Sequence, residues 1–386
     1  MDNRRLRFVD DAIAHQHQTH RWRSLTPVCP VDAVRVRKGD QILINFSAND
    51  YLGLAKHPAL IEAARTYTEL YGTGSTASRL VSGTYDIHAK LEATIATAVG
   101  QESALIFNSG FQANMSVLAT LADWHSLVVG DRLIHNSLIQ GILLSRATFK
   151  RYRHNDLNHL EAILKNAQQQ SYNRILIVAE TVFSMDGDRA NVAALIQLAE
   201  QYGAILYLDD AHAVGVLGEN GMGLAAHQPR VDVVVGTFGK SCGAFGAFVA
   251  CSAKLRDYLV NFCPGLIYTT ALPPGVLGTV LAALHLIPKM ERDRAHLHQM
   301  ADQVRSHLQS RGYDTAGSQS QIVPMIVGED GATLELAQSL EKQGVWAIAI
   351  RPPTVPNGTA RLRLALSSCH TVDHIHQLLH AMDQAT

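Results

Sequence analysis

Short apolar runs alternate with longer amphipathic segments over the central part of the chain. Two of the amphipathic segments, residues 157–169 and 192–202, carry apolar residues at the spacing of a helix. The apolar runs have the length of strands and include residues 103–107, 127–129, 174–179, 204–208 and 231–235. Buried strands that alternate with helices are typical of a mostly parallel sheet covered by helices on both faces. The pattern therefore predicts a large α/β domain.

The first 50 residues follow a different pattern. Residues 1–30 are polar and rich in histidine, with Leu6, Val9 and Ile13 at helical spacing. Residues 33–46 alternate between apolar and polar on both sides of a Lys-Gly-Asp turn, which predicts a β-hairpin. We therefore expect an N-terminal arm that consists of a helix and a hairpin.

The last hundred residues mix helices and strands on a smaller scale. A Pro-Pro pair at residues 273–274 opens a helical region that continues to about residue 311. Shorter segments with strand or helix patterns follow at residues 321–327, 334–343, 345–350 and 361–366, with a last helix after Thr371. This part predicts a smaller α+β domain. The expected division is an arm over residues 1–50, the α/β domain over 51–285 and the C-terminal domain over 286–386.

Composition and charge narrow the class of protein. The chain has 386 residues, of which 47% are hydrophobic and 17% charged, and this supports a compact globular protein with a large core. Lys and Arg number 33 against 34 Asp and Glu, which gives a formal net charge of -1. A nearly neutral chain argues against binding that depends on neutralising nucleic-acid phosphates.

The cysteines and the N-terminus indicate the compartment. The five cysteines are scattered and form no CxxC pair, so neither a disulfide framework nor a zinc site is expected. The N-terminus is followed by no signal-type apolar region, and no window approaches the ~18 uninterrupted apolar residues of a membrane span. We expect a reduced, cytoplasmic protein that does not enter the membrane.

Two groups of histidines have spacings at which a metal could bind. His15, His17 and His20 form one group, and His376 and His380 form the other. No cysteine or acid completes either set, and polar helix faces often include histidine. We therefore predict no metal site.

Polar residues end two of the predicted strands abruptly. Asp209, Asp210 and His212 follow the strand-like run 204–208, and Lys240 follows the run 231–235. Ligands of such sheets gather at the carboxyl ends of strands, although an acid at a strand end is often only a helix cap or a solvated loop residue. A lysine beside a core is costly unless its chemistry is used.

Three kinds of site place a lysine in such a segment. A phosphate-binding P-loop is excluded, because Val234 stands where that motif needs glycine. Residues 239–243 match the G-x-S-x-G elbow of serine hydrolases, which would make Ser241 a nucleophile. That elbow must open a helix, whereas residues 244–250 have the pattern of another strand, so the hydrolase is the weaker alternative.

The third kind is a Schiff-base lysine that binds pyridoxal phosphate (PLP). That chemistry needs an amine to hold the aldehyde and a carboxylate to keep the pyridine nitrogen protonated, and Lys240 and Asp209 suit these roles. The phosphate needs a cradle, and residues 108–113 offer a strand exit with a small-residue turn at a helix N-terminus. An ordinary helix cap at Ser109 would give the same local pattern.

Taken together, six motifs resemble a known family. They are NDYLGL at residues 49–54, STASRLVSG at 75–83, SGF at 109–111, FSMDGD at 183–188, DDAH at 209–212 and TFGK at 237–240. In this order they resemble the α-oxoamine synthases, and the resemblance extends from about residue 20 to the C-terminus. It implies a homodimeric fold-type I PLP enzyme that condenses an amino acid with an acyl thioester and releases carbon dioxide.

Two C-terminal segments refine the resemblance. Residues 267–274 and 350–364 look most like the family members of biotin biosynthesis. That resemblance implies condensation of L-alanine with pimeloyl-coenzyme A or a pimeloyl-acyl carrier protein to give 8-amino-7-oxononanoate. Ala213 and Val214 depart from it, because this pair is more familiar in the glycine-using relatives. A glycine-using synthase or ligase, of the 2-amino-3-ketobutyrate or 5-aminolevulinate type, is therefore the alternative within the family.

The resemblance also implies roles around the cofactor. Lys240 would form the Schiff base, Asp209 would pair with the pyridinium, and His135 would stack on the ring and lie beside the substrate. His212, aided by Ser184, would bind the phenolic oxygen. The phosphate would be held by a further group of residues, Ser109, Gly110, Phe111 and Thr237, with Thr269 reaching in from the partner subunit.

For the substrate, the resemblance implies a second group of positions. Arg363 would clamp the amino-acid carboxylate, a task that suits the planar guanidinium because it can form two parallel hydrogen bonds. Asn49, Arg23, Arg351 and Thr354 look like further substrate-binding positions.

Overall fold

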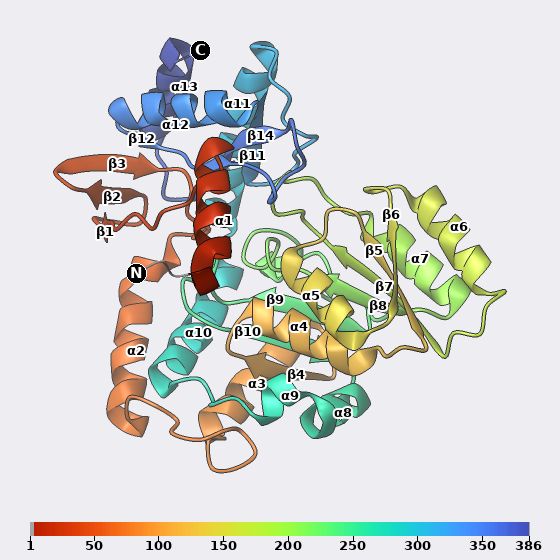
Figure 1. Cartoon of the computed structure of the whole chain (residues 1–386). Coiled ribbons are helices and arrows are strands. Elements are labelled where there is room, and N and C mark those ends of the chain that lie inside the picture. The colour runs from red at the N-terminus through yellow and green to blue at the C-terminus, as the bar shows by residue number, and fades with distance from the viewer. Residues whose placement is uncertain (1–3, 386) are drawn as a thin grey trace. The chain divides into compact units, whose positions relative to one another are not determined.

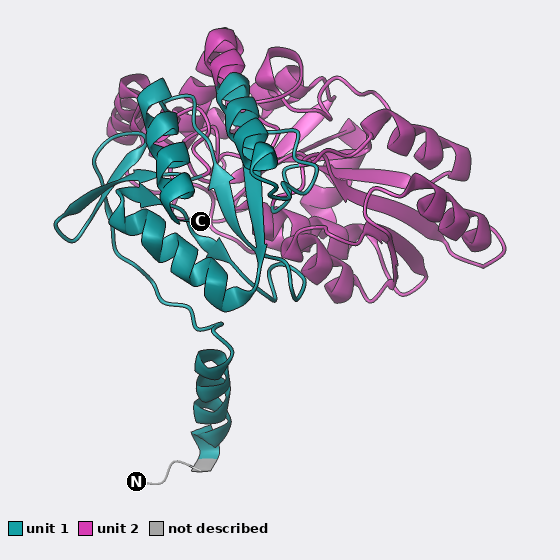
Figure 2. Ribbon diagram, turned by 90° about the horizontal axis from the view of Figure 1, so that it is seen from above, with its two compact units in different colours: residues 1–48, 185–187, 297–386 teal, residues 49–184, 188–296 magenta. Residues whose placement is uncertain are grey.

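The computed structural model describes residues 4–385 and contains two compact units (Figure 2). The large unit comprises residues 49–184 and 188–296. The small unit comprises the residues up to 48, residues 185–187 and those from 297 onward. The N-terminal residues thus cluster with the C-terminal ones, whereas the sequence pattern alone separates them into an arm and a domain.

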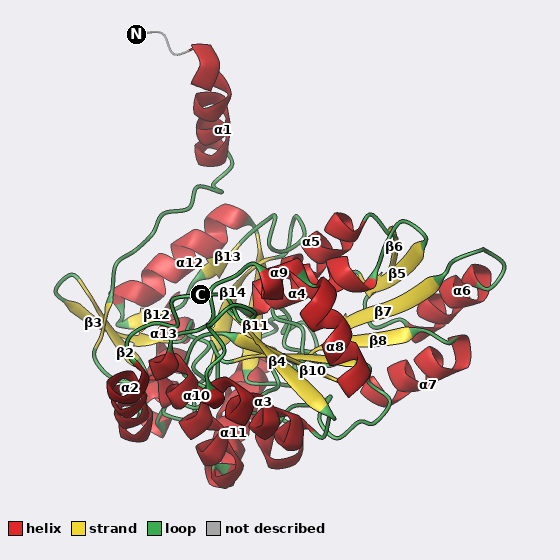
Figure 3. Ribbon diagram, turned by 90° about the horizontal axis from the view of Figure 1, so that it is seen from below, coloured by secondary structure: helices red, strands yellow, loops and turns green. Residues whose placement is uncertain are grey.

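The large unit is built on a seven-stranded sheet in the order β4-β10-β9-β8-β7-β5-β6 (Figures 1 and 3). All neighbouring pairs are parallel except those of β10, which is antiparallel to both β4 and β9. The strands are β4 (Ser103–Phe107), β5 (Ser126–Asp131), β6 (Thr148–Tyr152), β7 (Arg174–Glu180), β8 (Ile205–Asp209), β9 (Val233–Thr237) and β10 (Ala247–Cys251).

Helices cover both faces of this sheet. Successive strand residues point to opposite faces, so Val128 belongs to one hydrophobic cluster while its neighbours Leu127 and Val129 belong to the other. Helices α3 (Asp86–Val99), α6 (Leu157–Ala167), α7 (Val192–Tyr202) and α10 (Pro274–Leu286) bury side chains in the first cluster. Helices α4 (Gly110–Leu121), α5 (Asn136–Ser145) and α8 (Ala253–Phe262) bury side chains in the second. The predicted fold class is confirmed for this unit.

The remaining helical segments of the large unit are short or peripheral. Helix α2 lies against α10, and its first residue is a proline, which suits the first turn of a helix. The segments are η2 (Leu54–Lys56), α2 (Pro58–Tyr71), η3 (Glu219–Gly221), α9 (Pro264–Ile267) and η4 (Ile287–Lys289). The predicted single helical region after residue 273 is interrupted at η4, because Pro288 has no backbone N–H with which to continue the helical hydrogen bonds.

The small unit contains two small sheets and four longer helices. One sheet has the order β1-β2-β3-β12 and the other has the order β11-β14-β13. Its strands are β1 (Cys29–Pro30), β2 (Arg35–Lys38), β3 (Gln41–Asn45), β11 (Ile322–Gly328), β12 (Val345–Trp346), β13 (Ala349–Ile350) and β14 (Ala360–Ala365). Its helical segments are η1 (Arg4–Leu6), α1 (Arg7–Gln18), α12 (Asp330–Lys342), α13 (Val372–Ala385) and most of α11 (Glu291–Ser310).

The predicted hairpin is present as β2 and β3, and it joins the C-terminal residues through β12, which pairs parallel to β3. Residues 345–350, read from the sequence as one strand, form two strands in different sheets. Helix α1 has no buried residue, and Figures 2 and 3 show it standing away from the rest of the small unit. Across residues 4–385, no helix combines the length and the apolar character needed to cross a lipid bilayer.

Candidate active site

A cavity of about 180 Å³ lies in the large unit where several strands end. Its walls come from the ends of β7, β8 and β9 and from the N-terminal parts of α4 and α5. The lining residues are Gly110, Phe111, Asn114, His135, Ser137, Glu180, Asp209, Ala211, His212, Thr237 and Lys240. The two strand exits singled out in the sequence therefore open into one cavity.

Lys240 and His212 are in direct contact in this cavity. The Nζ atom of Lys240 lies 2.8 Å from Nε2 of His212, and the other ring nitrogen, Nδ1, lies 2.7 Å from the hydroxyl oxygen of Tyr51. The Tyr51 hydroxyl donates its single hydrogen to Oδ1 of Asn49, at 2.9 Å. The Nδ1 atom of His212 must then donate to Tyr51, so its Nε2 is the acceptor for the lysine. A hydrogen-bonded chain thus leads from Asn49 to Lys240.

Asp209 is held on two sides at the end of β8. The side-chain amide of Asn114 donates to its Oδ2 at 2.6 Å, and the backbone N–H of Ala211 donates to its Oδ1 at 2.9 Å. The same Asn114 amide donates to Ser137, and its carbonyl oxygen accepts the hydroxyl of Tyr207. These bonds fix the direction in which the carboxylate faces the cavity.

His135 lies at the start of α5, next to the cavity. Its Nδ1 is 2.7 Å from the hydroxyl of Ser137 and also accepts the backbone N–H of that residue. Burial lowers the pKa of His135; the charge of Asp209 opposes this shift and the charge of Lys240 adds to it. A neutral imidazole is therefore favoured at this position.

Glu180, the last residue of β7, is a second buried acid of the cavity. Its Oε1 has no hydrogen-bond partner within the described residues, although backbone groups of His135 and Ser184 bond to the carboxyl. Burial raises the pKa of Glu180 well above its usual range, and the nearby charge of Asp209 raises it further. The neutral form of the Glu180 carboxyl is therefore favoured in the cavity.

The part of the cavity wall formed by the start of α4 is suited to an anion. Gly110 begins α4, so the N–H groups of its first turn lack partners within the helix and carry partial positive charge. A Cβ atom on Gly110 would lie 3.8 Å from Cβ of Thr237, which places the end of β9 beside this helix start. Ser109 is the N-cap, and its hydroxyl accepts the N–H of Gln112. The cap interpretation of Ser109 is therefore correct, and it is compatible with anion binding by the residues that follow.

Three of the predicted cofactor residues do not line the cavity. Ser109 is the N-cap of α4. Ser184 is buried in the β7–α7 loop, where its backbone bonds to the carboxyl of Glu180. Thr269 accepts a hydrogen bond from the Asn108 side chain at 3.1 Å. The remaining cofactor residues are all in the cavity lining: Gly110, Phe111, His135, Asp209, His212, Thr237 and Lys240.

The predicted substrate residues other than Asn49 and His135 belong to the small unit. Arg23 donates to the Thr354 hydroxyl at 3.2 Å, and the Arg351 guanidinium donates to the backbone oxygens of His20 and Trp22. Arg23, Arg351 and Thr354 therefore form one cluster within this unit. Arg363 is a buried residue of β14.

Sequence reasoning missed five residues of the site: Tyr51, Asn114, Ser137, Glu180 and Ala211. Glu180 carried a usable signal, because it is an acid that ends an apolar strand, as Asp209 does. Tyr51 lay inside a quoted motif, but nothing in its surroundings connected it with His212. Asn114 and Ser137 lie in helices, where their contacts depend on the tertiary fold.

The serine hydrolase alternative is wrong for Ser241. This residue is fully buried, and its Oγ has no hydrogen-bond partner in the part of the chain that the structure describes. Gly243 has φ of 59° and a Cβ there would lie 2.3 Å from the backbone nitrogen of Ala55, so this glycine serves a tight turn. Cys242 is likewise buried, and burial raises the pKa of its thiol to about 12, as expected for a packing residue.

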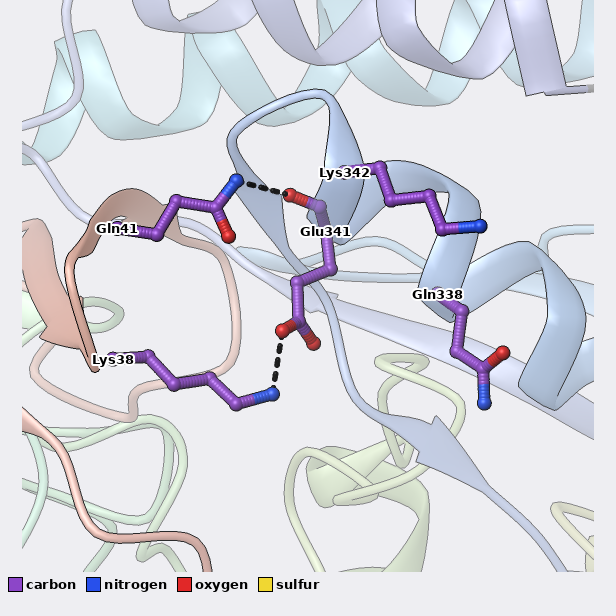
Figure 4. Close-up of a pocket in the computed structure, with 5 residues that line it drawn as sticks. All are labelled: Lys38, Gln41, Gln338, Glu341 and Lys342. Carbon is purple, nitrogen blue, oxygen red and sulfur yellow. Dashed lines mark hydrogen bonds and ion pairs between the residues drawn. The ribbon is translucent and has the colours of Figure 1, made fainter.

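Another hollow, of about 420 Å³, lies in the small unit (Figure 4). Lys38 and Glu341 form an ion pair across it, and Gln41 donates to the backbone of Glu341. Gln338 and Lys342 complete its lining. Its lining contains no histidine, and its one carboxylate is paired with Lys38, so the combination of lysine, histidine and aspartate in the large-unit cavity has no counterpart there.

The fold and the cavity together define an α/β enzyme of the transferase type with a lysine at a strand exit. Residues 41–382 match the family model of class I and II aminotransferases. A relative from Gluconacetobacter diazotrophicus named 8-amino-7-oxononanoate synthase is 48% identical, over 98% of this chain and 96% of its own.

Two solved structures agree with this placement. An 8-amino-7-oxononanoate synthase from Francisella tularensis is 30% identical with a TM-score of 0.77, over 89% of this chain and 97% of its own. A structure described as SPT with PLP is 27% identical with a TM-score of 0.93, over 98% of both chains. The chain belongs to the class I and II aminotransferase family and, within it, groups with the 8-amino-7-oxononanoate synthases.

Proposed function

We propose that this enzyme binds PLP and condenses L-alanine with a pimeloyl thioester, with loss of carbon dioxide, to give 8-amino-7-oxononanoate. The observation that carries the proposal is the meeting of Lys240, His212 and Asp209 in one cavity. The names of the relatives, together with the C-terminal segments noted in the sequence, support the choice of substrates.

The residues of the cavity fit PLP. Its phosphate matches the start of α4 with Thr237, its pyridine nitrogen matches the carboxylate of Asp209, and its aldehyde matches the amine of Lys240. The orphaned Oε1 of Glu180 also points to a ligand, because a buried polar atom without a partner is costly. His135 would lie against the ring.

When bound, PLP supplies a carbonyl that captures the substrate amine and a ring that delocalises negative charge at the substrate α-carbon. The protein has to move a proton at that carbon, and Lys240 is the amine that can do so. His212 accepts a hydrogen bond from Lys240, and Tyr51 fixes the tautomer in which it can accept. Asp209, oriented by Asn114, would accept a hydrogen bond from the protonated pyridine nitrogen.

For the substrates, we propose that Arg363 binds the alanine carboxylate and that Asn49, with the cluster of Arg23, Arg351 and Thr354, contacts the substrate. The acyl carrier is either coenzyme A or an acyl carrier protein. Ala213 and Val214, which favoured glycine in the sequence, are buried and do not line the cavity. Val214 instead packs toward Gly236 of β9. We therefore infer that Ala213 and Val214 do not select glycine over alanine by direct contact with the substrate.

We also propose a homodimer. Residues 77–78 and 270–271 are bridged by backbone hydrogen bonds, and next to them Leu80, Val81 and Tyr268 expose 54%, 79% and 83% of their surface. Exposed apolar groups that lie close together mark interaction sites.

Sedimentation tests the dimer: the mass of the wild-type protein should be twice the 42.1 kDa of one chain, and the double variant Val81→Asp/Tyr268→Asp should shift the mass toward that of one chain. Full activity in a monomer would contradict the proposal.

The test of the function combines a spectrum with product analysis. The purified protein should absorb visible light, lose the band on borohydride reduction, and carry the reduced cofactor on Lys240 by mass spectrometry. With pimeloyl-coenzyme A, kcat/KM for alanine should exceed that for glycine by ~10-fold or more, since one methyl contributes about 1 to 3 kcal/mol. A preference for glycine with a short acyl donor would overturn the substrate assignment and leave the PLP assignment standing.

A further inference from the structure

His154, in the loop between β6 and α6, lies between two carboxylates of the large unit. Its Nδ1 is 2.9 Å from Oδ1 of Asp131, and its Nε2 is 2.8 Å from Oδ2 of Asp188. The side chain of Asp131 is fully buried, that of Asp188 is 12% exposed and that of His154 is 25% exposed. The imidazole ring also lies nearly perpendicular to the ring of Phe183, with 4.4 Å between the centroids.

This geometry defines the charge of the imidazole. A carboxylate can only accept a hydrogen bond, and a neutral imidazole has a single N–H to donate. Both ring nitrogens face a carboxylate, so both must carry a proton. Burial by itself would lower the pKa of His154, but the hydrogen bonds and charges of Asp131 and Asp188 raise it to about 10. The imidazolium therefore persists at neutral pH.

The two acids belong to the loops that carry the active-site residues. Asp131 ends β5 four residues before His135, and its carboxylate also accepts the backbone N–H groups of Leu133 and Asn155. Asp188 lies in the loop after β7. Its backbone oxygen accepts the N–H of Phe183, which precedes Ser184. The side chain of Asn155 adds a hydrogen bond to Asp188 at 2.7 Å.

We propose that His154 is a positioning residue whose imidazolium ties together the loops after β5, β6 and β7 and thereby fixes His135 and the β7–α7 loop at the cofactor cavity. No residue of the hydrogen-bonded set Asp131–His154–Asp188 lines the cavity, so its effect is indirect. The catalytic readout rests on the function proposed above, whereas the protonation of His154 does not.

The first test is the protonation state. In protein with labelled histidine side chains, one of the 19 histidines should show two protonated ring nitrogens by NMR at pH 8.5, and this signal should vanish in His154→Gln. In Asp188→Asn the same signal should titrate at lower pH, because one carboxylate is gone. A neutral His154 at pH 8.5 would overturn the proposal, whatever reaction the enzyme catalyses.

The second test separates positioning from general stability. His154→Gln should raise the Kd of the cofactor-free protein for PLP ~10-fold and lower kcat ~10- to 100-fold at temperatures well below its Tm, as expected for displaced reacting groups. The matched control is Arg153→Gln, in the same loop, whose side chain is 65% exposed and pairs with Asp156 three residues further on. The control should stay within about 2-fold of wild type. A lowered Tm in His154→Gln with unchanged Kd and kcat would refute positioning, and wild-type protein without PLP affinity would instead refute the proposed function.

Discussion

Replacing Asn114 by alanine should destabilise the protein strongly, because this single substitution removes three buried hydrogen bonds. Asn114 is 2% exposed and uses its whole amide: both hydrogens go to Asp209 and Ser137, and the oxygen accepts the Tyr207 hydroxyl. Tyr207 is fully buried and has no access to water, whereas Asp209 lies beside a cavity that water can enter. In Asn114→Ala the Tyr207 hydroxyl loses its partner at about 1 to 3 kcal/mol, and Asp209 loses a charge-assisted bond that water replaces in part.

We therefore expect the free energy of unfolding to fall by about 2 to 4 kcal/mol, measured by urea denaturation of the cofactor-free protein. Tyr207→Phe provides the control, because it removes the hydroxyl itself. It should cost about 1 kcal/mol in the wild type, yet be neutral or stabilising when Asn114 is already alanine, since the orphaned hydroxyl is then gone. A loss below about 1 kcal/mol, or additive effects of the two changes, would refute this account of the network.

Other predictions follow from the site and the core. Lys240→Ala should still bind the cofactor through the other cavity residues but turn over at least ~10³-fold more slowly; near wild-type single-turnover rates would contradict its role. Arg363→Ala should lose roughly 2 to 5 kcal/mol in kcat/KM for alanine, with poor rescue by Arg363→Lys, which steady-state kinetics can check. Burial raises the pKa of Asp210 to about 6, so the folded protein binds this proton more tightly than the unfolded chain does. Its free energy of unfolding should fall as pH rises from about 4 to 6, by about 3 kcal/mol for this group. Asp210→Asn should flatten that slope in urea titrations at several pH values, and an unchanged slope would rule out Asp210 as its source.

The local sequence was sufficient to predict a site residue or the bounds of an element where these depend on a single strand or helix. Lys240 and Asp209 were found because a charged residue ends an apolar strand, and β4 and α7 have the bounds that their patterns indicate. Edge strand β6 was missed, because most of its residues are only partly buried or exposed and it lacks the apolar run of a buried strand. Residues 345–350 read as one strand because their β pattern is continuous, and only pairing with different partners separates β12 from β13.

The hydrogen-bond network around Lys240 could not be predicted from the sequence, because it also depends on contacts between distant segments. Asn114 lies 95 positions before Asp209 in the sequence, and Tyr51 lies 161 positions before His212, so no local pattern connects either pair. The direction of each hydrogen bond in the chain from Asn49 to Lys240 depends on which atoms the fold brings within about 3 Å. Such contacts follow from packing across several strands, and a hydrophobic pattern with a period of two or 3.6 residues does not predict them.

The antiparallel strand β10 has a consequence for motion. Lys240 lies in the connection between β9 and β10, which are paired with each other in the interior of the sheet. Two backbone bonds close this connection, from the N–H of Phe238 to the oxygen of Gly246 and from the N–H of Ala244 to the oxygen of Phe238. The N–H groups of Phe238 and Ala244 should therefore exchange slowly with solvent. These bonds fix the two ends of the connection that carries Lys240, so we expect a gate that admits substrate or releases product to be formed by segments outside this hairpin.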